Sequence, residues 1–180
     1  MAQQDVLSWF WAPLCAVGSR GPGGPNAQVC VSVFGASIVP DRPRVLVSLS
    51  KTNYTHDLVV ASNTLAVSLL ARNQVGLLQP LGLQSGRDGP KLAGLQVELT
   101  PAGDPWFPGA IGMLACEVIR TADHGDATAF LCAVTHRESF PGEPLPWAAA
   151  RELVGEEFLL RWAEKSAREQ AAARQSMLWP

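Results

Sequence analysis

The feature that most constrains the fold is a succession of short apolar segments separated by proline- and glycine-rich breaks. Their composition favours strands over helices. The expected strands span residues 12–18, 28–34, 45–49, 65–70, 110–119 and 127–135. His124-Gly-Asp126 is a good hairpin turn between the last two. Many short strands, with turns between them and few long helices, are typical of an antiparallel barrel.

Helices are expected at three places. One runs from about Thr55 to Ser62, and a short one is capped by Asn73 and ends near Pro80. Residues 148–175, rich in Ala, Glu and Arg, form the third and have only Gly155 to weaken it. The chain therefore divides into a barrel domain, residues 1–145, and a helical C-terminal extension, residues 146–180.

An apolar stripe suggests what the C-terminal extension does. Val154, Phe158 and Trp162 recur at every fourth position, so they should pack on the barrel or on a partner subunit. The extension ends in Met177-Leu-Trp-Pro180. This apolar tip is expected to make a dimer contact or to cover a ligand, unless it is simply a frayed end.

Composition excludes several functions. A net charge of −2 gives no basic footprint for nucleic acid, and no apolar run approaches the length of a membrane span. The first residues do not resemble a signal peptide, so a cytoplasmic location is expected. The four cysteines lack a metal-binding spacing and are expected to be small buried hydrophobes, and no metal site is predicted.

The stretch Val45–Val60 carries most of the chemistry. It is predicted to be a strand, a tight turn and a helix start, where hydroxyls and one ammonium gather: Ser48, Ser50, Lys51, Thr52 and Thr55. The first amides of a helix lack partners and attract anions, so this is a candidate phosphate site. The alternative is that Thr52 or Thr55 merely caps the helix. His56 and Asp57 are adjacent and should point apart, so they make a poor catalytic dyad.

The order of motifs over residues 12–140 resembles the flavin reductase-like family. Five pieces carry the resemblance: Pro13 before a glycine-rich turn and Asn26; a strand with Ser32 and Phe34; Lys51-x-x-x-Thr55; the Gly-Ala strand of Phe107–Val118; and Gly125-Asp126 before a strand with Phe130. The resemblance implies a mainly β fold, a Greek-key-like split β-barrel that binds FMN. It also implies a homodimer with the flavin near the subunit interface.

The resemblance also assigns site residues. The FMN phosphate would lie against Ser48, Ser50, Lys51, Thr52 and Thr55, and the isoalloxazine ring along Ser32, Val33 and Phe34. FAD is a possible substitute for FMN. Arg87, in the 84–87 loop, would contact phosphate or a nicotinamide cofactor. Ser32 as a plain strand residue and Arg87 as an exposed loop arginine are the alternatives.

One departure bears on the reaction. The family hairpin reads Gly-Asp-His, but Ala127 stands at the third position here, and the nearby histidine, His124, precedes the glycine. His124 and Asp126 are therefore the candidates for contacts with flavin or nicotinamide. The first hypothesis is hydride transfer from NAD(P)H to FMN, supplying a monooxygenase. The alternatives are a flavin-binding electron carrier, flavoredoxin-like and reduced by a protein partner, and a barrel that binds no flavin and serves in assembly.

Overall fold

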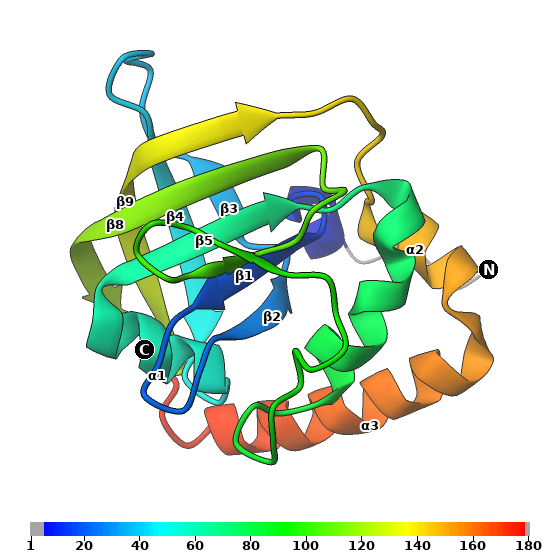
Figure 1. The fold of residues 1–180 in the computed structure, drawn as a ribbon. Coiled ribbons are helices and arrows are strands. Elements are labelled where there is room, and N and C mark those ends of the chain that lie inside the picture. Colours follow the sequence, from blue (N-terminus) through cyan, green and yellow to red (C-terminus); the bar gives the residue numbers. More distant parts are fainter. Residues whose placement is uncertain (1–5, 179–180) are drawn as a thin grey trace.

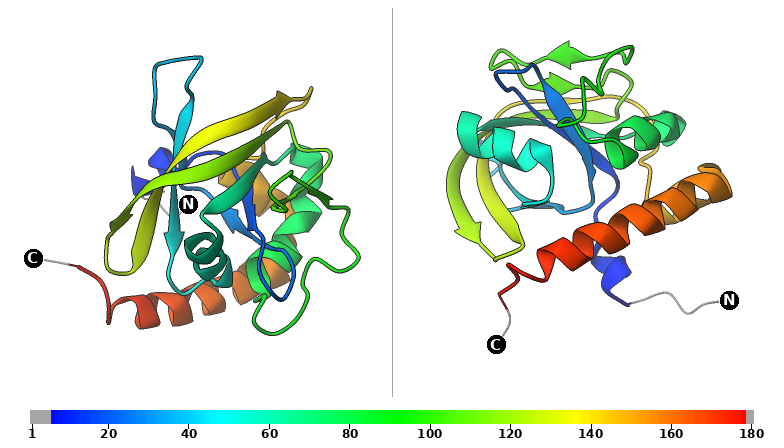
Figure 2. Two further views of the ribbon diagram at one scale, coloured as in Figure 1. Left: turned by 60° about the vertical axis from the view of Figure 1, so that its left-hand side comes forward. Right: turned by 90° about the horizontal axis from the view of Figure 1, so that it is seen from below.

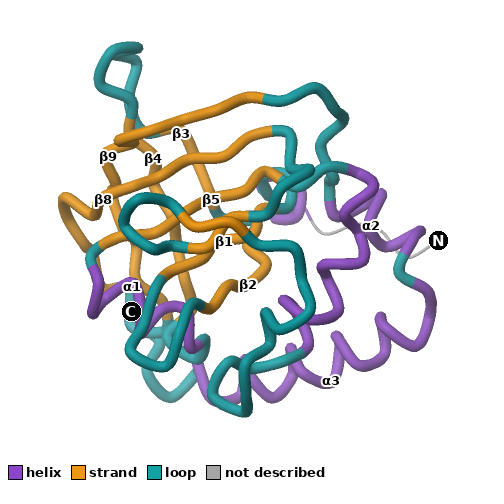
Figure 3. Tube along the Cα trace, viewed as in Figure 1, coloured by secondary structure: helices purple, strands orange, loops and turns teal. Residues whose placement is uncertain are grey.

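The computed structural model describes residues 6–178 and shows a mainly β protein with helices along one side (Figure 1). Seven strands form one sheet in the order β2-β1-β5-β8-β9-β4-β3, with every pairing antiparallel. The strands are β1 (Cys15–Ser19), β2 (Asn26–Cys30), β3 (Val33–Gly35), β4 (Arg44–Ser50), β5 (Thr64–Leu69), β8 (Gly112–Asp123) and β9 (Ala127–Ser139). A small second sheet pairs β6 (Glu98–Leu99) with β7 (Pro105–Trp106). The sheet is curled, which confirms the expected fold class (Figure 3).

The predicted single strand over residues 28–34 is wrong, because the chain changes partners in its middle. The Val31 carbonyl accepts a hydrogen bond from Ala12, on the β1 side. The next carbonyl, that of Ser32, accepts from the Ser48 amide of β4 at 3.0 Å. β2 and β3 therefore lie at opposite ends of the strand order but are joined by two residues. Apolar periodicity cannot reveal such a switch, since the apolar residues run on from β2 into β3 and are interrupted only by Ser32.

The hairpin between β8 and β9 matches its predicted turn. The His124 amide donates to the Ala127 carbonyl at 2.9 Å, and Gly125 has a φ of +90°, which glycine adopts without strain. Both strands are longer than predicted, reaching Asp123 and Ser139. The C-terminal ends of both strands are mostly exposed, so the apolar pattern that predicts a strand does not extend over them.

The helices differ from prediction at their ends. α1 spans Tyr54–Ser62 with Asn53 at the N-cap and no side-chain capping bond, so neither Thr52 nor Thr55 caps it. Ala71, rather than Asn73, precedes the 3-10 helix η2 (Arg72–Leu77). The chain then continues through Pro80 as η3 (Gln79–Leu83), because a proline in the first turn of a helix needs no N–H partner.

The predicted C-terminal helix is two helices, α2 (Trp147–Leu153) and α3 (Gly155–Ala173). The break occurs at Gly155, whose φ is +77°. η1 (Val6–Phe10) is a further 3-10 helix at the other end of the described chain. Met177 and Leu178 are exposed, while Trp179 and Pro180, the remainder of the predicted apolar tip, lie outside the described residues.

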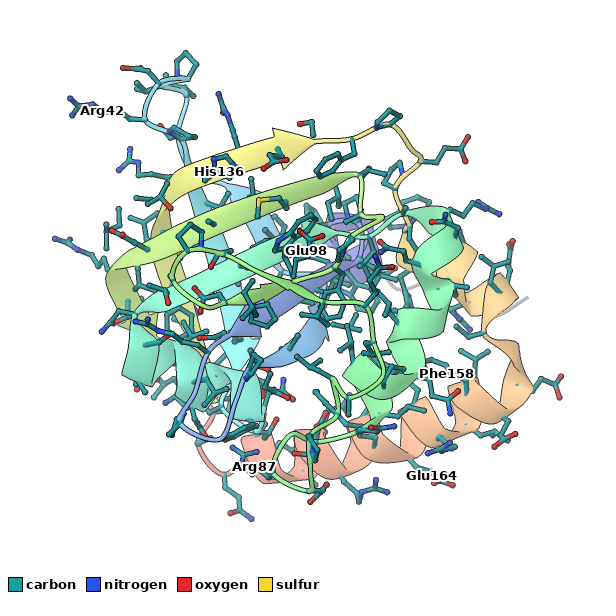
Figure 4. All side chains as sticks on the ribbon, in the orientation of Figure 1. Arg42, Arg87, Glu98, His136, Phe158 and Glu164 are labelled. Carbon is teal, nitrogen blue, oxygen red and sulfur yellow. The ribbon has the colours of Figure 1, made fainter. Side chains whose placement is uncertain are left out.

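Two apolar clusters hold the fold together. The first fills the curled sheet and includes Phe130, Val47 and all four cysteines, which confirms the cysteines as buried apolar residues. The second lies between β1, β2, η2, η3 and the C-terminal helices, and it contains Phe158 with Val154 and Trp162 packed against it. In Figure 4 Phe158 lies on the side of α3 that faces the rest of the molecule and Glu164 on the outer side. The predicted stripe thus packs α3 on the barrel of its own chain.

Candidate functional site

The turn between β4 and α1 contains several of the side chains predicted to bind phosphate, but these side chains do not all point toward the start of α1. Ser50 and Thr52 share a hydroxyl–hydroxyl hydrogen bond of 2.9 Å. Lys51 is turned away from the start of α1, because its Nζ donates to Asp123 Oδ1 at 2.7 Å. That bond lowers the pKa of the Asp123 carboxyl. Ser48 lies further back in β4, opposite Ala129.

The start of α1 is fixed from beneath and from above. Beneath it, Asn26 Nδ2 donates to the buried Thr55 hydroxyl at 2.7 Å. Above it, Arg87 donates to the Thr52 carbonyl at 2.8 Å and to Asp57 Oδ2 at 2.6 Å. Arg87 therefore joins the predicted site, as the residue that ties the 84–91 loop to α1.

His56 and Asp57 belong to the same network, contrary to the expectation that they would point apart. Asp57 Oδ1 is 3.2 Å from His56 Nδ1, and His56 Nε2 is 2.9 Å from the Thr128 hydroxyl. The two side chains meet although adjacent residues of a helix do not face each other. The imidazole is buried against Phe130, so the network supports α1 on the barrel.

A small cavity of about 40 Å³ opens beside this helix start. Its walls are Gln28 of β2, the backbone and side chains of Thr52 to Thr55, the 84–86 loop and Lys91, together with Lys165 and Glu169 of α3. Such a volume holds a few water molecules or a phosphate group, but it does not hold a tricyclic ring. In the left view of Figure 2, α3 runs along the bottom of the molecule, below α1.

Gln28, one of the residues that line the cavity, has a buried side-chain oxygen without a partner among the described residues. Gln28 is 7% exposed, yet its Oε1 accepts no hydrogen bond. A buried acceptor of this kind is costly unless a ligand or water donates to it. Sequence reasoning missed Gln28, because a glutamine in a strand carries no signal of a site.

The cavity also holds charges that the sequence did not single out. Lys91 Nζ donates to the carbonyls of Leu81 and Gln84, at 3.3 and 3.1 Å. Burial lowers the pKa of Lys91 to about 8, and the positive charge of Lys165 adds to this effect. Lys165 forms an ion pair with Glu169 one helical turn along. In the sequence, Lys165 and Glu169 show only a spacing of four residues, and that spacing is also typical of an ordinary ion pair on a helix surface.

The residues predicted along the isoalloxazine ring lie apart from the cavity wall. Val33 and Phe34 are in β3, paired with Val47 and Leu46 of β4, and Phe34 is 42% exposed. β3 is the last strand of the sheet, so its outer edge is free of a strand partner within residues 6–178. An exposed apolar side chain beside an unpaired strand edge is a surface that suits a planar, hydrogen-bonding ring.

The hairpin candidates lie at the tip between β8 and β9. The Asp126 carbonyl accepts from the Lys51 amide at 2.9 Å, which attaches the tip to the β4–α1 turn. His124 is exposed. The C-terminal segment lies against the tip, because a Cβ on Gly125 would be 2.2 Å from the Ser176 carbonyl.

Comparison with known proteins decides the family. Residues 7–151 match the family described as flavin reductase like domain. The chain belongs to this family. The match ends within α2, so α3 lies outside it.

Three relatives illustrate the family. The high molecular weight rubredoxin of Moorella thermoacetica is 32% identical over 126 residues, covering 68% of this chain and 54% of the relative. The chain thus spans about half the length of that relative. The FMN reductase (NADH) RutF of Pseudomonas syringae pv. syringae is 26% identical, covering 74% of each. The NADH:FAD oxidoreductase SgcE6 of Streptomyces globisporus C-1027 superposes with a TM-score of 0.68 at 26% identity, covering 76% of this chain and 80% of that one.

Two further observations concern the described part of the chain. Between Val6 and Leu178, no three His, Cys, Asp or Glu side chains are grouped so as to hold a metal ion. No helix in that range has the length and apolar character needed to cross a membrane.

Proposed function

We propose that this flavin reductase-like protein binds FMN and passes hydride from NADH or NADPH to it. The observation that carries the proposal is the cavity at the start of α1, which is lined in part by Gln28, a residue whose buried Oε1 has no partner among the described residues. Support comes from two relatives of about one quarter identity, one named FMN reductase (NADH) and the other NADH:FAD oxidoreductase. FAD is accommodated if its adenosine part extends beyond the cavity.

Different residues of the chain would bind the phosphate, the ribityl chain and the ring of the cofactor. The amides of Tyr54 and Thr55, at the positive end of α1, and the Thr52 hydroxyl would bind the phosphate. Gln28 Oε1 would accept a hydrogen bond from a hydroxyl of the ribityl chain. Ser32, Val33 and Phe34 would support the ring, while Ser48, Ser50 and Lys51 shape the turn beside it. When bound, the flavin supplies the hydride acceptor.

The protein's part in the reaction is positioning and exclusion of water, because hydride transfer needs no general base. Asp126 and His124 stand at the hairpin tip, where a nicotinamide would approach. Arg87 fixes the adjoining loop through Thr52 and Asp57.

The second candidate is a flavin-binding electron carrier reduced by a protein partner. Ala127 in place of the family histidine favours it, since His124 is exposed at the tip of the turn. A matched relative is named a rubredoxin rather than a reductase. The first proposal also includes a monooxygenase as electron acceptor, a homodimer and a cytoplasmic location.

Absorbance spectroscopy tests both candidates. The purified protein, titrated with FMN, should gain a bound-flavin spectrum and should bind FMN at least about tenfold more tightly than riboflavin, since one charge-assisted hydrogen bond to phosphate is worth about 1.5–3 kcal/mol. Failure to bind either flavin would leave only the assembly role. Anaerobic addition of NADH and NADPH then separates reductase from carrier: bleaching by either nucleotide supports the reductase, and bleaching by neither supports the carrier.

A further inference from the structure

The cavity at the start of α1 is built partly by a segment outside the family domain. The matched region ends at residue 151, but Lys165 and Glu169 of α3 line the same cavity as Thr52 to Thr55. α3 is held there by apolar packing, since Trp162 lies against Gly82, where a Cβ would be 2.5 Å from the indole ring. The position of Lys165, one turn beyond Trp162, is therefore fixed by the core.

The charges in this wall are not balanced. Lys91 and Lys165 carry two positive charges and Glu169 one negative charge, and Glu169 is already paired with Lys165. An ammonium has three hydrogens to donate, and Lys91 gives two of them to the carbonyls of Leu81 and Gln84. The Lys165 side chain is 23% exposed, so its charge is only partly screened by water.

The remaining groups of the wall also favour an anion. The first turn of α1 presents backbone amides, and Thr55, buried under it, is oriented by Asn26. Gln28, which also lines the cavity, is 7% exposed, and its Oε1 has no partner among the described residues. A phosphate ester that also carries hydroxyl groups satisfies both the cations and this oxygen.

We propose that α3 supplies Lys165 as a phosphate-binding residue which, with Lys91, closes the phosphate end of the flavin site, and that Glu169 weakens this contact by competing for Lys165. The inference rests on the proposed flavin binding and extends it to a segment beyond the family domain. The ligand class is a flavin carrying a phosphate ester, and the C-terminal extension discriminates it from the free ribityl alcohol.

Three full-length variants test the role of Lys165. Lys165→Gln should raise the dissociation constant for FMN about tenfold and that for riboflavin less than about twofold, because only FMN has the phosphate. Glu169→Gln should lower the dissociation constant for FMN severalfold, since it frees the ammonium. Arg168→Gln, which removes a charge from an exposed position of the same helix, should change neither. Flavin fluorescence titrations at low ionic strength, with melting temperatures recorded for each variant, give the comparison.

The opposite signs expected for Lys165→Gln and Glu169→Gln separate phosphate binding from helix support. If the ion pair merely holds α3, both substitutions will weaken FMN and riboflavin alike, which overturns the inference. A Lys165→Gln variant as unaffected as Arg168→Gln overturns it too, with flavin binding itself intact. Absence of flavin binding by the unsubstituted protein would overturn the proposed function and this inference together.

Discussion

At the scale of single residues, Lys91 should make FMN affinity depend on pH. In the free protein, burial lowers the pKa of Lys91 to about 8, so it is charged below that pH and neutral above it. A phosphate favours the charged form, so the affinity is full below pH 8 and declines as the pH rises through it. We expect the dissociation constant for FMN to increase about tenfold from pH 7 to pH 9.

A Lys91→Met variant is the control that distinguishes an effect of Lys91 from effects of its charged neighbours Lys165, Glu169 and Asp88. Lys91→Met should bind FMN more weakly at pH 7 and should show a flat profile up to pH 9. Riboflavin should show no dependence with either protein. A profile for Lys91→Met as steep as that of the unsubstituted protein would assign the titration to another group.

Gly86 should be needed for the loop to close on α1. A Cβ there would lie 2.3 Å from Asn26 Oδ1 and 2.7 Å from Tyr54 Cδ1. Asn26 cannot easily move, since it is bonded to Thr55. Gly86→Ala should therefore destabilise the protein by about 1–3 kcal/mol, as overpacking does, and should weaken FMN binding. Gly76→Ala, where a Cβ meets nothing within 4 Å, is the matched control in urea unfolding and should be near neutral.

At the scale of the elements, the sequence predicts whether a segment is a strand or a helix better than it predicts which strands pair. Short β-branched runs, the His124–Asp126 turn and the hydroxyls before α1 are local signals, and apart from residues 28–34 they lie in the expected elements. The switch from β2 to β3 was missed because it depends on hydrogen bonds from Ala12 and Ser48, both distant along the chain. The same limit applies to the site: Gln28, Lys91 and Lys165 meet only through folding, and none belongs to a motif.

The boundary between α2 and α3 does have a local signal in the sequence: Gly155, which was expected only to weaken a single helix. Gly155 has a φ of +77°, a conformation that costs other residues about 1–2 kcal/mol. A Cβ there meets nothing within 4 Å, so the cost of Gly155→Ala is confined to the backbone.

The expected result for Gly155→Ala is therefore a loss of about 1 kcal/mol in the free energy of unfolding. Gly23→Ala, also with open space around its Cβ, serves as the control and should stay within about 0.5 kcal/mol. Urea unfolding curves measure both. Equal stability of the two variants would mean that the α2–α3 junction adapts, for example by continuing as one helix.

At the scale of the whole molecule, the two ends of the proposed flavin site differ in exposure. The cavity of about 40 Å³ proposed for the phosphate is lined in part by α3, whereas Phe34 on β3, proposed to support the ring, is 42% exposed. η1 also presents exposed aromatic side chains, Trp9 and Phe10, each 72% exposed, and it is followed by Ala12, whose amide donates to the carbonyl of Val31, two residues before β3. Adjoining exposed aromatic residues of this kind mark an interaction surface.

We therefore expect a homodimer with η1 and β3 at its interface, and a ring site completed by the second copy. Sedimentation velocity should give twice the chain mass of 19.2 kDa. Replacing Trp9 and Phe10 together by serine should yield a monomer that binds FMN more weakly. Leu160→Ser, at a 67% exposed position on α3, should leave the dimer unchanged. A monomeric unsubstituted protein that binds FMN would show that one chain completes the site, with the exposed aromatic residues then serving another partner.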